Sequence, residues 1–150
     1  MEVYNSSMND FLIKKIEQKD LEAFVELWNQ GYEMLTSSKF KMTYEKALKG
    51  FTSQLFNYTG LYKNNQLVGF MLLKEDGNEI WIKHLLIDKN EREKGLGGML
   101  IKEVINTKDK EIFTEVLKEN ETAIKFVQEN GFEVLKNDLE NNQFIFKFKM

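Results

Sequence analysis

The sequence has no cysteine and no proline, and its one histidine is His84. The lack of cysteine excludes disulfides, thiolate nucleophiles and sulfur-ligated zinc, and one histidine leaves no convincing ligand set for another metal. We therefore expect no metal cofactor. Without proline, the turns must depend on glycine, asparagine and aspartate.

Long apolar runs are also missing. Runs such as 85–87 fall far short of the ~18 residues that a membrane-spanning helix needs, and 30% of the residues are charged. The polar stretch 1–10 has no basic segment followed by an apolar one, so it does not resemble a secretory signal. We expect a cytoplasmic protein that does not bind membranes.

The chain carries no basic excess. Its net charge is −3 and its pI about 5.4, whereas proteins that bind a nucleic-acid backbone are usually basic. We therefore expect no nucleic-acid partner, and the mild acidity is compatible with a cationic amine substrate. The 150 residues, 42% of them hydrophobic, predict a single domain over residues 1–150, with residues 1–9 flexible.

Hydrophobic periodicity predicts alternating strands and helices. Asp20, Thr43 and Asn120 are expected to cap helices, and Asn64-Asn65 to join two strands in a hairpin. The predicted order is β-α-α-β-β-β-α-β-α-β-β, which indicates an α+β fold, an α/β sandwich around one mixed sheet. The main segments are strands at 11–16, 60–63, 66–73, 79–87 and 112–117, helices at 21–28, 44–55, 96–105 and 121–127, and a final strand pair around Asn141-Asn142.

A glycine-rich loop follows the strand at 79–87. It reads Arg92-Glu93-Lys94-Gly95-Leu96-Gly97-Gly98 and leads into a helix. A helix start presents free N–H groups and the positive end of the helix dipole, and glycine lets a bulky anion approach the backbone. With Arg92 and Lys94 at the rim, the loop predicts a pyrophosphate site. The alternative is a strand-to-helix turn that binds nothing.

Two other nucleotide motifs are excluded. A dinucleotide-binding fingerprint needs glycine where Leu100 stands, and a P-loop needs Gly-Lys-Ser/Thr at its end. Instead, Arg92, Gly95 and Gly97 match the Arg/Gln-x-x-Gly-x-Gly/Ala motif of the GNAT acetyltransferases. The stretch 120–132, with Asn120-x-x-Ala123-x-x-Phe126 and then Asn130-Gly131-Phe132, also resembles this family.

The resemblance covers residues 79–132 and is weak over 1–60. It implies the GNAT fold, a sheet of about seven strands flanked by about four helices, with acetyl-CoA as co-substrate. The pyrophosphate would lie on the glycine loop and the pantetheine would pair with strand 85–87, where the N–H of Leu86 would polarise the thioester carbonyl. The implied cofactor-binding residues are Leu85, Leu86, Ile87, Arg92, Lys94, Gly95, Leu96, Gly97, Gly98, Met99 and Asn120, of which Asn120 could equally be only a helix cap.

The family often carries its general base on the strand that matches 79–87. Simple alternation places Glu79 on the face of Trp81 and Lys83, where the family has its bases, although one pleat further out. Glu79 is therefore the candidate base, and a solvated strand-end carboxylate is the alternative. His84 falls on the opposite face and is expected to be a hydrogen-bonded core or interface histidine, unless a bulge changes the facing.

Val127 stands where the family usually has the tyrosine that protonates the leaving thiolate. Water or another hydroxyl, such as that of Tyr32, Tyr44, Tyr58 or Tyr62, would have to replace it. The resemblance thus implies an N-acetyltransferase, a monomer or homodimer, acting by direct attack of a primary amine of a small molecule or peptide. The acceptor would bind near 32–42. The alternatives are a CoA-binding sensor or partner-binding module with little catalysis, and a domain that binds nothing.

Overall fold

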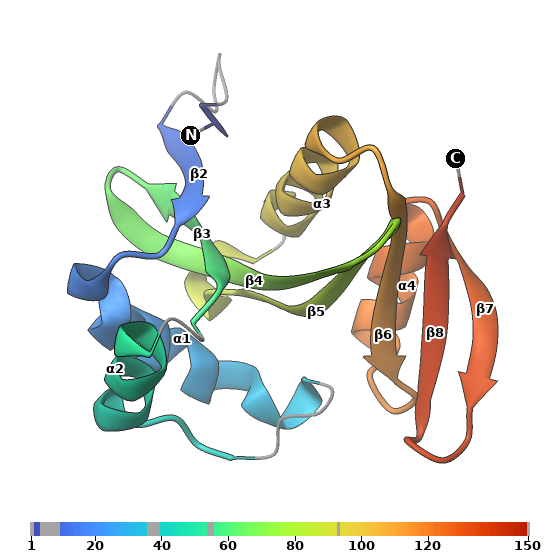
Figure 1. Cartoon of the computed structure of the whole chain (residues 1–150), viewed down its shortest axis with the longest axis horizontal. Coiled ribbons are helices and arrows are strands. Elements are labelled where there is room, and N and C mark those ends of the chain that lie inside the picture. The colour runs from blue at the N-terminus through green and yellow to red at the C-terminus, as the bar shows by residue number, and fades with distance from the viewer. Residues whose placement is uncertain (1, 4–9, 36–39, 54–55, 93, 150) are drawn as a thin grey trace.

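Figure 1 shows the computed structural model, which describes residues 2–3, 10–35, 40–53, 56–92 and 94–149. Within these residues, four α-helices flank an eight-stranded sheet in the order β1-β2-β3-β4-β5-β6-β8-β7. The strands are β1 (Glu2–Val3), β2 (Phe11–Lys15), β3 (Tyr58–Lys63), β4 (Gln66–Asp76), β5 (Glu79–Ile87), β6 (Glu111–Leu117), β7 (Phe132–Asp138) and β8 (Gln143–Phe148). The helices are α1 (Leu21–Gly31), α2 (Tyr44–Thr52), α3 (Leu96–Thr107) and α4 (Glu121–Glu129), with short 3-10 helices η2 (Gln18–Asp20), η3 (Tyr32–Met34) and η4 (Lys89–Glu91).

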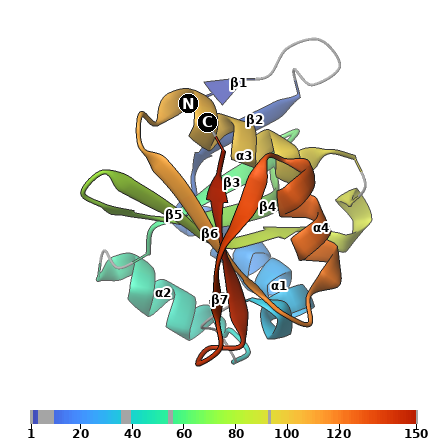
Figure 2. The ribbon, with the colours of Figure 1, turned by 90° about the vertical axis from the view of Figure 1, so that its right-hand side faces the viewer.

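The sheet separates two hydrophobic cores. On one face, Trp28 of α1 packs in a cluster with Phe70 of β4. On the other face, Leu100 of α3 and Val127 of α4 cluster with Ile80 of β5. Figure 2 shows α3 above the sheet and α1 and α2 below it. The predicted α+β sandwich is confirmed, and the order of elements matches once the short strand β1 is added.

The predicted turns have the backbone that their residues favour. Asn64 and Asn65, between β3 and β4, have φ of 49° and 66°, as a two-residue type I′ hairpin requires. Gly77 and Asn142 turn the next two hairpins with φ of 60° and 51°. Gly131 follows α4 with φ of 95°, the left-handed conformation common just after a helix.

The two predicted N-caps on the α1 and α2 side differ. Thr43 caps α2, since its side chain accepts the N–H of Lys46 at 3.2 Å. Asp20 precedes α1, but its carboxylate accepts the hydroxyl of Tyr62 at 2.9 Å and makes no cap hydrogen bond. Asp20 therefore occupies the predicted N-cap position of α1 but makes no side-chain cap, because a tertiary partner takes its carboxylate. Leu55, expected in the second helix, lies outside the described residues.

Strands β5 and β6 form a fork. They pair in parallel from Glu79↔Glu111 to Ile82↔Thr114, and beyond this point they run apart (Figure 1). The Thr114 hydroxyl donates to the carbonyl of Ile82 at 2.8 Å, so a side chain completes the last step of the pairing. We use "the fork" for the opening between β5 from Lys83 to Ile87 and β6 from Glu115 to Leu117.

A β-bulge interrupts β5 at the base of the fork. On β4 the neighbours Leu72 and Leu73 pair with His84 and Ile82, so Lys83 is the extra residue on β5. An extra residue in one strand reverses the facing of the side chains on either side of it.

The bulge corrects one prediction. Ile80 and Ile82, before it, belong to the core under α3 and α4, whereas Leu86, after it, belongs to the core under α1. The His84 ring lies against Trp28 of α1, with ring centroids 5.4 Å apart. Simple alternation placed His84 with Ile80 and Ile82, and this was wrong, because the bulge turns His84 to the α1 face.

Candidate functional site

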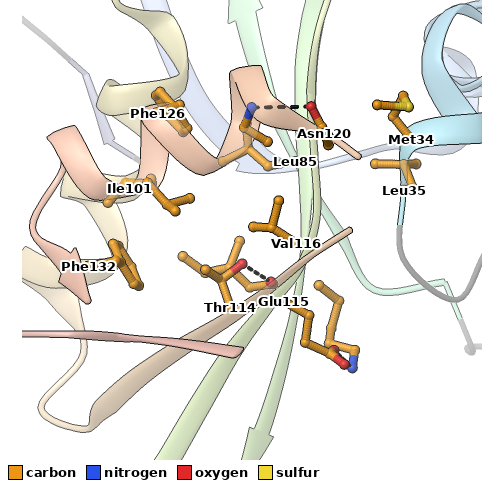
Figure 3. Close-up of a pocket in the computed structure, with 14 residues that line it drawn as sticks. Met34, Leu35, Leu85, Ile101, Thr114, Glu115, Val116, Asn120, Phe126 and Phe132 are labelled. Carbon is orange, nitrogen blue, oxygen red and sulfur yellow. Dashed lines mark hydrogen bonds and ion pairs between the residues drawn. The ribbon is translucent and has the colours of Figure 1, made fainter. Parts of the chain in front are cut away.

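The fork opens into a narrow, mostly apolar cavity of about 80 Å³. Figure 3 shows that β5, β6, α3 and α4 contribute to its walls, with Met34 of η3 and the adjacent Leu35 on one side. The apolar lining includes Leu85, Ile101, Val116, Phe126, Val127 and Phe132, and the polar lining Lys83, Thr114, Glu115 and Asn120.

The backbone of β5 has one edge on the fork. The N–H of Asp88 donates to the carbonyl of Val68 on β4 at 2.8 Å. Hydrogen-bonded pairs alternate along an antiparallel ladder, and Leu86 pairs with Phe70 two positions along. The N–H of Leu86 therefore points toward β4 and away from the fork.

The backbone N–H and C=O groups of the two residues beside Leu86 point the other way. By the same alternation, Leu85 and Ile87 direct their N–H and C=O groups toward the β6 side. In agreement with this, the carbonyl of Ile87 accepts a hydrogen bond from Nε of Arg92 at 3.1 Å. Leu85, and not the expected Leu86, thus has its N–H on the fork.

The glycine loop, Gly95–Gly98, lies at the start of α3, and we call it the cradle. Gly95 has φ of 78°, and a Cβ there would meet no atom within 4 Å. The N–H groups of Leu96, Gly97 and Gly98 lie in the first turn, where no intrahelical acceptor exists. The N–H of Met99 already donates to the carbonyl of Gly95 at 3.1 Å, so the cradle has three donors and excludes Met99, which the prediction had included.

Two glycines of the cradle serve helix packing. A Cβ on Gly97 would lie 2.8 Å from Cζ of Phe126 on α4, and one on Gly98 would lie 3.3 Å from Oδ1 of Asn130. Their missing side chains let α4 approach α3.

Two cations, Arg92 and Lys94, stand in the loop just before the cradle, and a third contacts this loop through Glu91. Lys94 lies 3.2 Å and Lys63 lies 3.1 Å from the carboxylate of Glu91. The hydrogen bond from Lys63, followed by that from Lys94, lowers the pKa of Glu91, which therefore stays ionised and holds both lysines. No sequence pattern pointed to Lys63, because only the β3–β4 register brings it near the loop. Glu93 lies outside the described residues.

Helix α4 contributes a cap and an apolar wall. Oδ1 of Asn120 accepts the N–H of Ala123 at 3.2 Å, so the predicted cap is confirmed, and the residue also lines the cavity. Val127 is buried beside it. None of Tyr32, Tyr44, Tyr58 and Tyr62 lines this cavity.

His84 is held by an aromatic cluster on the α1 face. It is 7% exposed, and its Nδ1 lies 3.0 Å from the hydroxyl of Tyr58. Burial raises the pKa of the Tyr58 phenol, so this group stays protonated near neutral pH. The expectation of a hydrogen-bonded, buried histidine is confirmed, although the histidine also directly precedes Leu85 at the fork.

Glu79 lies at the closed end of the β5–β6 pair. Its carboxylate accepts the indole N–H of Trp81 at 3.0 Å, and its backbone neighbours are Asp76 and Glu111. Lys83 lies four positions further along β5, a span of about 13 Å along a strand. The structure therefore does not bring Glu79 to the fork.

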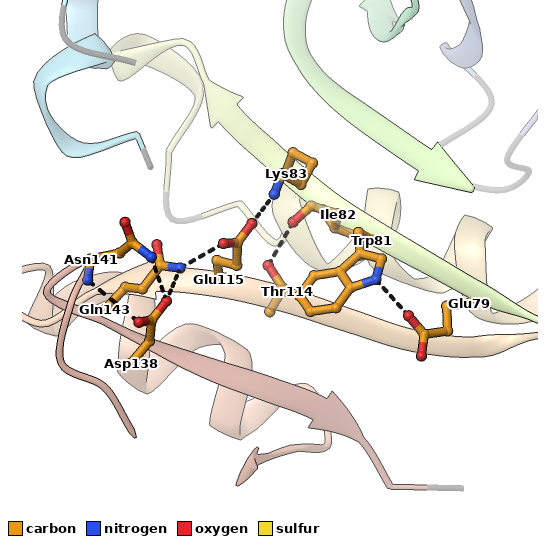
Figure 4. Close-up of polar contacts among 9 residues, drawn as sticks. All are labelled: Glu79, Trp81, Ile82, Lys83, Thr114, Glu115, Asp138, Asn141 and Gln143. Carbon is orange, nitrogen blue, oxygen red and sulfur yellow. Dashed lines mark hydrogen bonds and ion pairs between the residues drawn. The ribbon is translucent and has the colours of Figure 1, made fainter. Parts of the chain in front are cut away.

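A polar network that the sequence did not suggest lies at the inner end of the fork (Figure 4). Lys83 forms an ion pair with Glu115 of β6. The second oxygen of Glu115 accepts from Nε2 of Gln143 at 2.6 Å, and the same nitrogen lies 3.0 Å from Asp138. These residues come from β5, β6, β7 and β8, and the pairing of these four strands brings them together.

Two further features are absent from the described residues. They contain no group of three or more His, Cys, Asp and Glu residues placed to hold a metal ion. Among the helices in this part of the chain, none has the length and apolar character needed to cross a bilayer.

Comparisons with known proteins agree with this geometry. The family model described as acetyltransferase (GNAT) family matches residues 14–132. A peptidyl-lysine N-acetyltransferase, YjaB of Escherichia coli K12, is 25% identical over 125 residues, which cover 81% of this chain and 82% of that protein.

Solved structures share the fold. An acetyltransferase from Thermus thermophilus superposes with a TM-score of 0.78 at 16% identity, over 93% of this chain and 97% of that one. The PaiA N-acetyltransferase of Thermoplasma acidophilum, in complex with coenzyme A, gives 0.75 at 21% identity, over 93% and 99%. The forked sheet thus has the fold of these two structures. Because the family model covers well over half of the residues, the chain belongs to the GNAT family of N-acetyltransferases.

Proposed function

We propose that this protein transfers the acetyl group of acetyl-CoA to a primary amine of a small molecule or peptide. The observation that carries the proposal is the fork, with an anion cradle of three backbone N–H groups just beyond the end of β5. A long, slender donor with a pyrophosphate at one end suits this combination of a narrow apolar cavity and a helix N-terminus.

The donor would follow β5. Its pyrophosphate would bind Leu96–Gly98, with Arg92 and Lys94 beside it, and its pantetheine would pair with the fork edge of Leu85–Ile87. The N–H of Leu85 would then polarise the thioester carbonyl, in the role expected of Leu86. Asn120 would contact the pantetheine from the opposite wall.

His84 is our candidate for the group that takes the proton from the acceptor amine. It directly precedes Leu85, and Tyr58 orients its ring. In the tautomer whose Nδ1–H donates to the Tyr58 oxygen, Nε2 keeps the lone pair that a general base needs. Glu79, the base expected from the sequence, lies at the closed end of the β5–β6 pair. It would have to act over the span of about 13 Å between that end and Lys83.

The proposal is tested with the purified protein and a panel of amines that includes lysine peptides and polyamines. Acetyl-CoA should raise the melting temperature, because a ligand that binds only the folded state stabilises it. At least one amine should then release free CoA above the rate without acceptor. A thermal shift without amine-dependent release would favour the CoA-binding module, for which the missing acid at Val127 is the specific argument.

Val127 gives a second test, since it lines the cavity where the family has its acid. Val127→Tyr should cost about 1–3 kcal/mol of stability, because a larger ring must enter a packed wall. We expect no gain in kcat, since the thiol of CoA is acidic enough to leave without a fixed donor. Val127→Phe is the matched control, with similar bulk and no hydroxyl. A kcat for the tyrosine variant tenfold above that of the phenylalanine variant would show that the missing acid limits the rate.

A further inference from the structure

The ion pair of Lys83 with Glu115 closes the inner end of the fork. Lys83 is the bulge residue of β5, and Glu115 is the first residue of β6 beyond the last paired position. Both line the cavity, and their side chains are only 23% and 11% exposed. A primary amine of the protein itself therefore lies at the base of the site.

Neighbouring groups fix the position of this amine. Gln143, which is 4% exposed, donates to the second oxygen of Glu115 and so holds the carboxylate in place. Nζ of Lys83 lies 5.6 Å from the centre of the Trp81 ring, a cation–π distance. Figure 4 shows the Lys83 side chain extending from β5 across to Glu115.

The position of the donor's acyl end rests on the proposed function. A donor bound at the cradle and running back along Leu85–Ile87 would present its acyl end toward the closed end of the fork. Lys83 precedes Ile87 by four residues, about 13 Å along the strand. The amine thus lies at the end of the path that the pantetheine would follow.

We propose that Lys83 is a modification site, an internal acceptor that the protein acetylates with its own acetyl-CoA. The ammonium of Lys83 gives one proton to the Glu115 carboxylate, which passes it to solvent. The nitrogen attacks the thioester carbonyl, the C–N bond forms and the C–S bond breaks. The second proton of the nitrogen goes to the departing thiolate, so the products are acetyl-lysine, free CoA and one proton.

The modification changes the charge of the site. Acetyl-lysine is neutral, so Glu115 loses its ion-pair partner and keeps the hydrogen bond from Gln143. A partly buried carboxylate without a cation is unfavourable, and an acceptor ammonium would relieve this. Acetylated Lys83 therefore prepares the inner end of the fork for a cationic acceptor.

The experiment follows acetylation of each lysine by peptide mass spectrometry after acetyl-CoA is added without an acceptor. Lys125 of α4 and Lys136 of β7 are exposed and report the uncatalysed background. Lys83 should react at least roughly tenfold faster than either, despite its burial, because the donor is bound beside it. Glu115→Gln should slow the acetylation of Lys83, because it removes the carboxylate that takes the proton.

Two variants make the result decisive. Lys83→Arg keeps the charge but cannot form the amide, so it should lose the single equivalent of CoA that the wild type releases without acceptor. Gly95→Asp, which blocks the cradle, should reduce the acetylation of Lys83 to the background rate. Equal rates at Lys83, Lys125 and Lys136 would overturn the inference. If acetyl-CoA still raises the melting temperature and an amine still releases CoA in that case, the proposed function stands; if neither happens, both fail.

Discussion

Replacing Gly95 with aspartate is expected to weaken acetyl-CoA binding by ~10²-fold. The new carboxylate would lie at the start of α3, beside the N–H groups that we propose bind the pyrophosphate. Two like charges about 5 Å apart repel by ~3 kcal/mol at an effective dielectric constant of ~20, which corresponds to about two orders of magnitude in Kd. The measurement is the Kd of acetyl-CoA by titration calorimetry.

The structure makes Gly95 suitable for this test. Its φ of 78° lies in the left-handed region, which asparagine and aspartate enter more readily than other side chains. A Cβ there meets nothing within 4 Å, and an acidic residue at a helix N-terminus is favourable. Gly97 would be a poor choice, because its Cβ would collide with Phe126 and lower stability whatever the ligand.

Gly95→Asn is the matched control, because it has the same shape and backbone tolerance without the charge. We expect it to bind acetyl-CoA much more tightly than Gly95→Asp, with a difference that shrinks at high salt. Equal Kd values for the two variants would show that the cradle is not part of the acetyl-CoA site.

The parts of the fold that the sequence predicted are those fixed by local chemistry. Asn64-Asn65 formed the hairpin because asparagine tolerates positive φ, and Thr43 and Asn120 capped helices because a short side chain reaches its own first turn. The position of the glycine loop at the start of a helix was also predicted from local sequence. Local chemistry did not determine the side chain of Asp20, because its carboxylate accepts a hydrogen bond from Tyr62, which is distant in the sequence.

The errors within the site come from strand register. One extra residue, Lys83, reversed the facing of His84, and no local pattern marks that bulge. The same dependence on register explains the change from Leu86 to Leu85, because the direction of an N–H is set by pairing with β4. Glu115 was overlooked, since its position at the fork follows from where β5 and β6 stop pairing.

The reversed facing of His84 leads to the second large effect. His84→Gln is expected to lower kcat for amine-dependent CoA release by ~10²-fold or more, the usual contribution of a positioned base. Glu79→Gln should leave the rate near that of the wild type, because Glu79 lies at the closed end of the strand pair. The reverse order was the expectation before the bulge was known. The measurement is kcat for both variants across pH.

His84 is buried, so loss of rate must be separated from loss of structure. Melting temperature and the Kd of acetyl-CoA should be measured for each variant, and Tyr58→Phe gives an intermediate case, because it keeps the imidazole and removes only its hydrogen-bond partner.

If His84 is the base, His84→Gln should lose most of kcat while acetyl-CoA binding persists, and its deficit should narrow at high pH, where the acceptor amine is already uncharged. Tyr58→Phe should lose less of kcat, because it keeps the imidazole. If His84 only supports the aromatic cluster around Trp28, His84→Gln should lower the melting temperature while the pH profile keeps its shape. A loss of rate in Glu79→Gln larger than in His84→Gln would reject the assignment altogether, because proton transfer would then have to reach the closed end of the sheet.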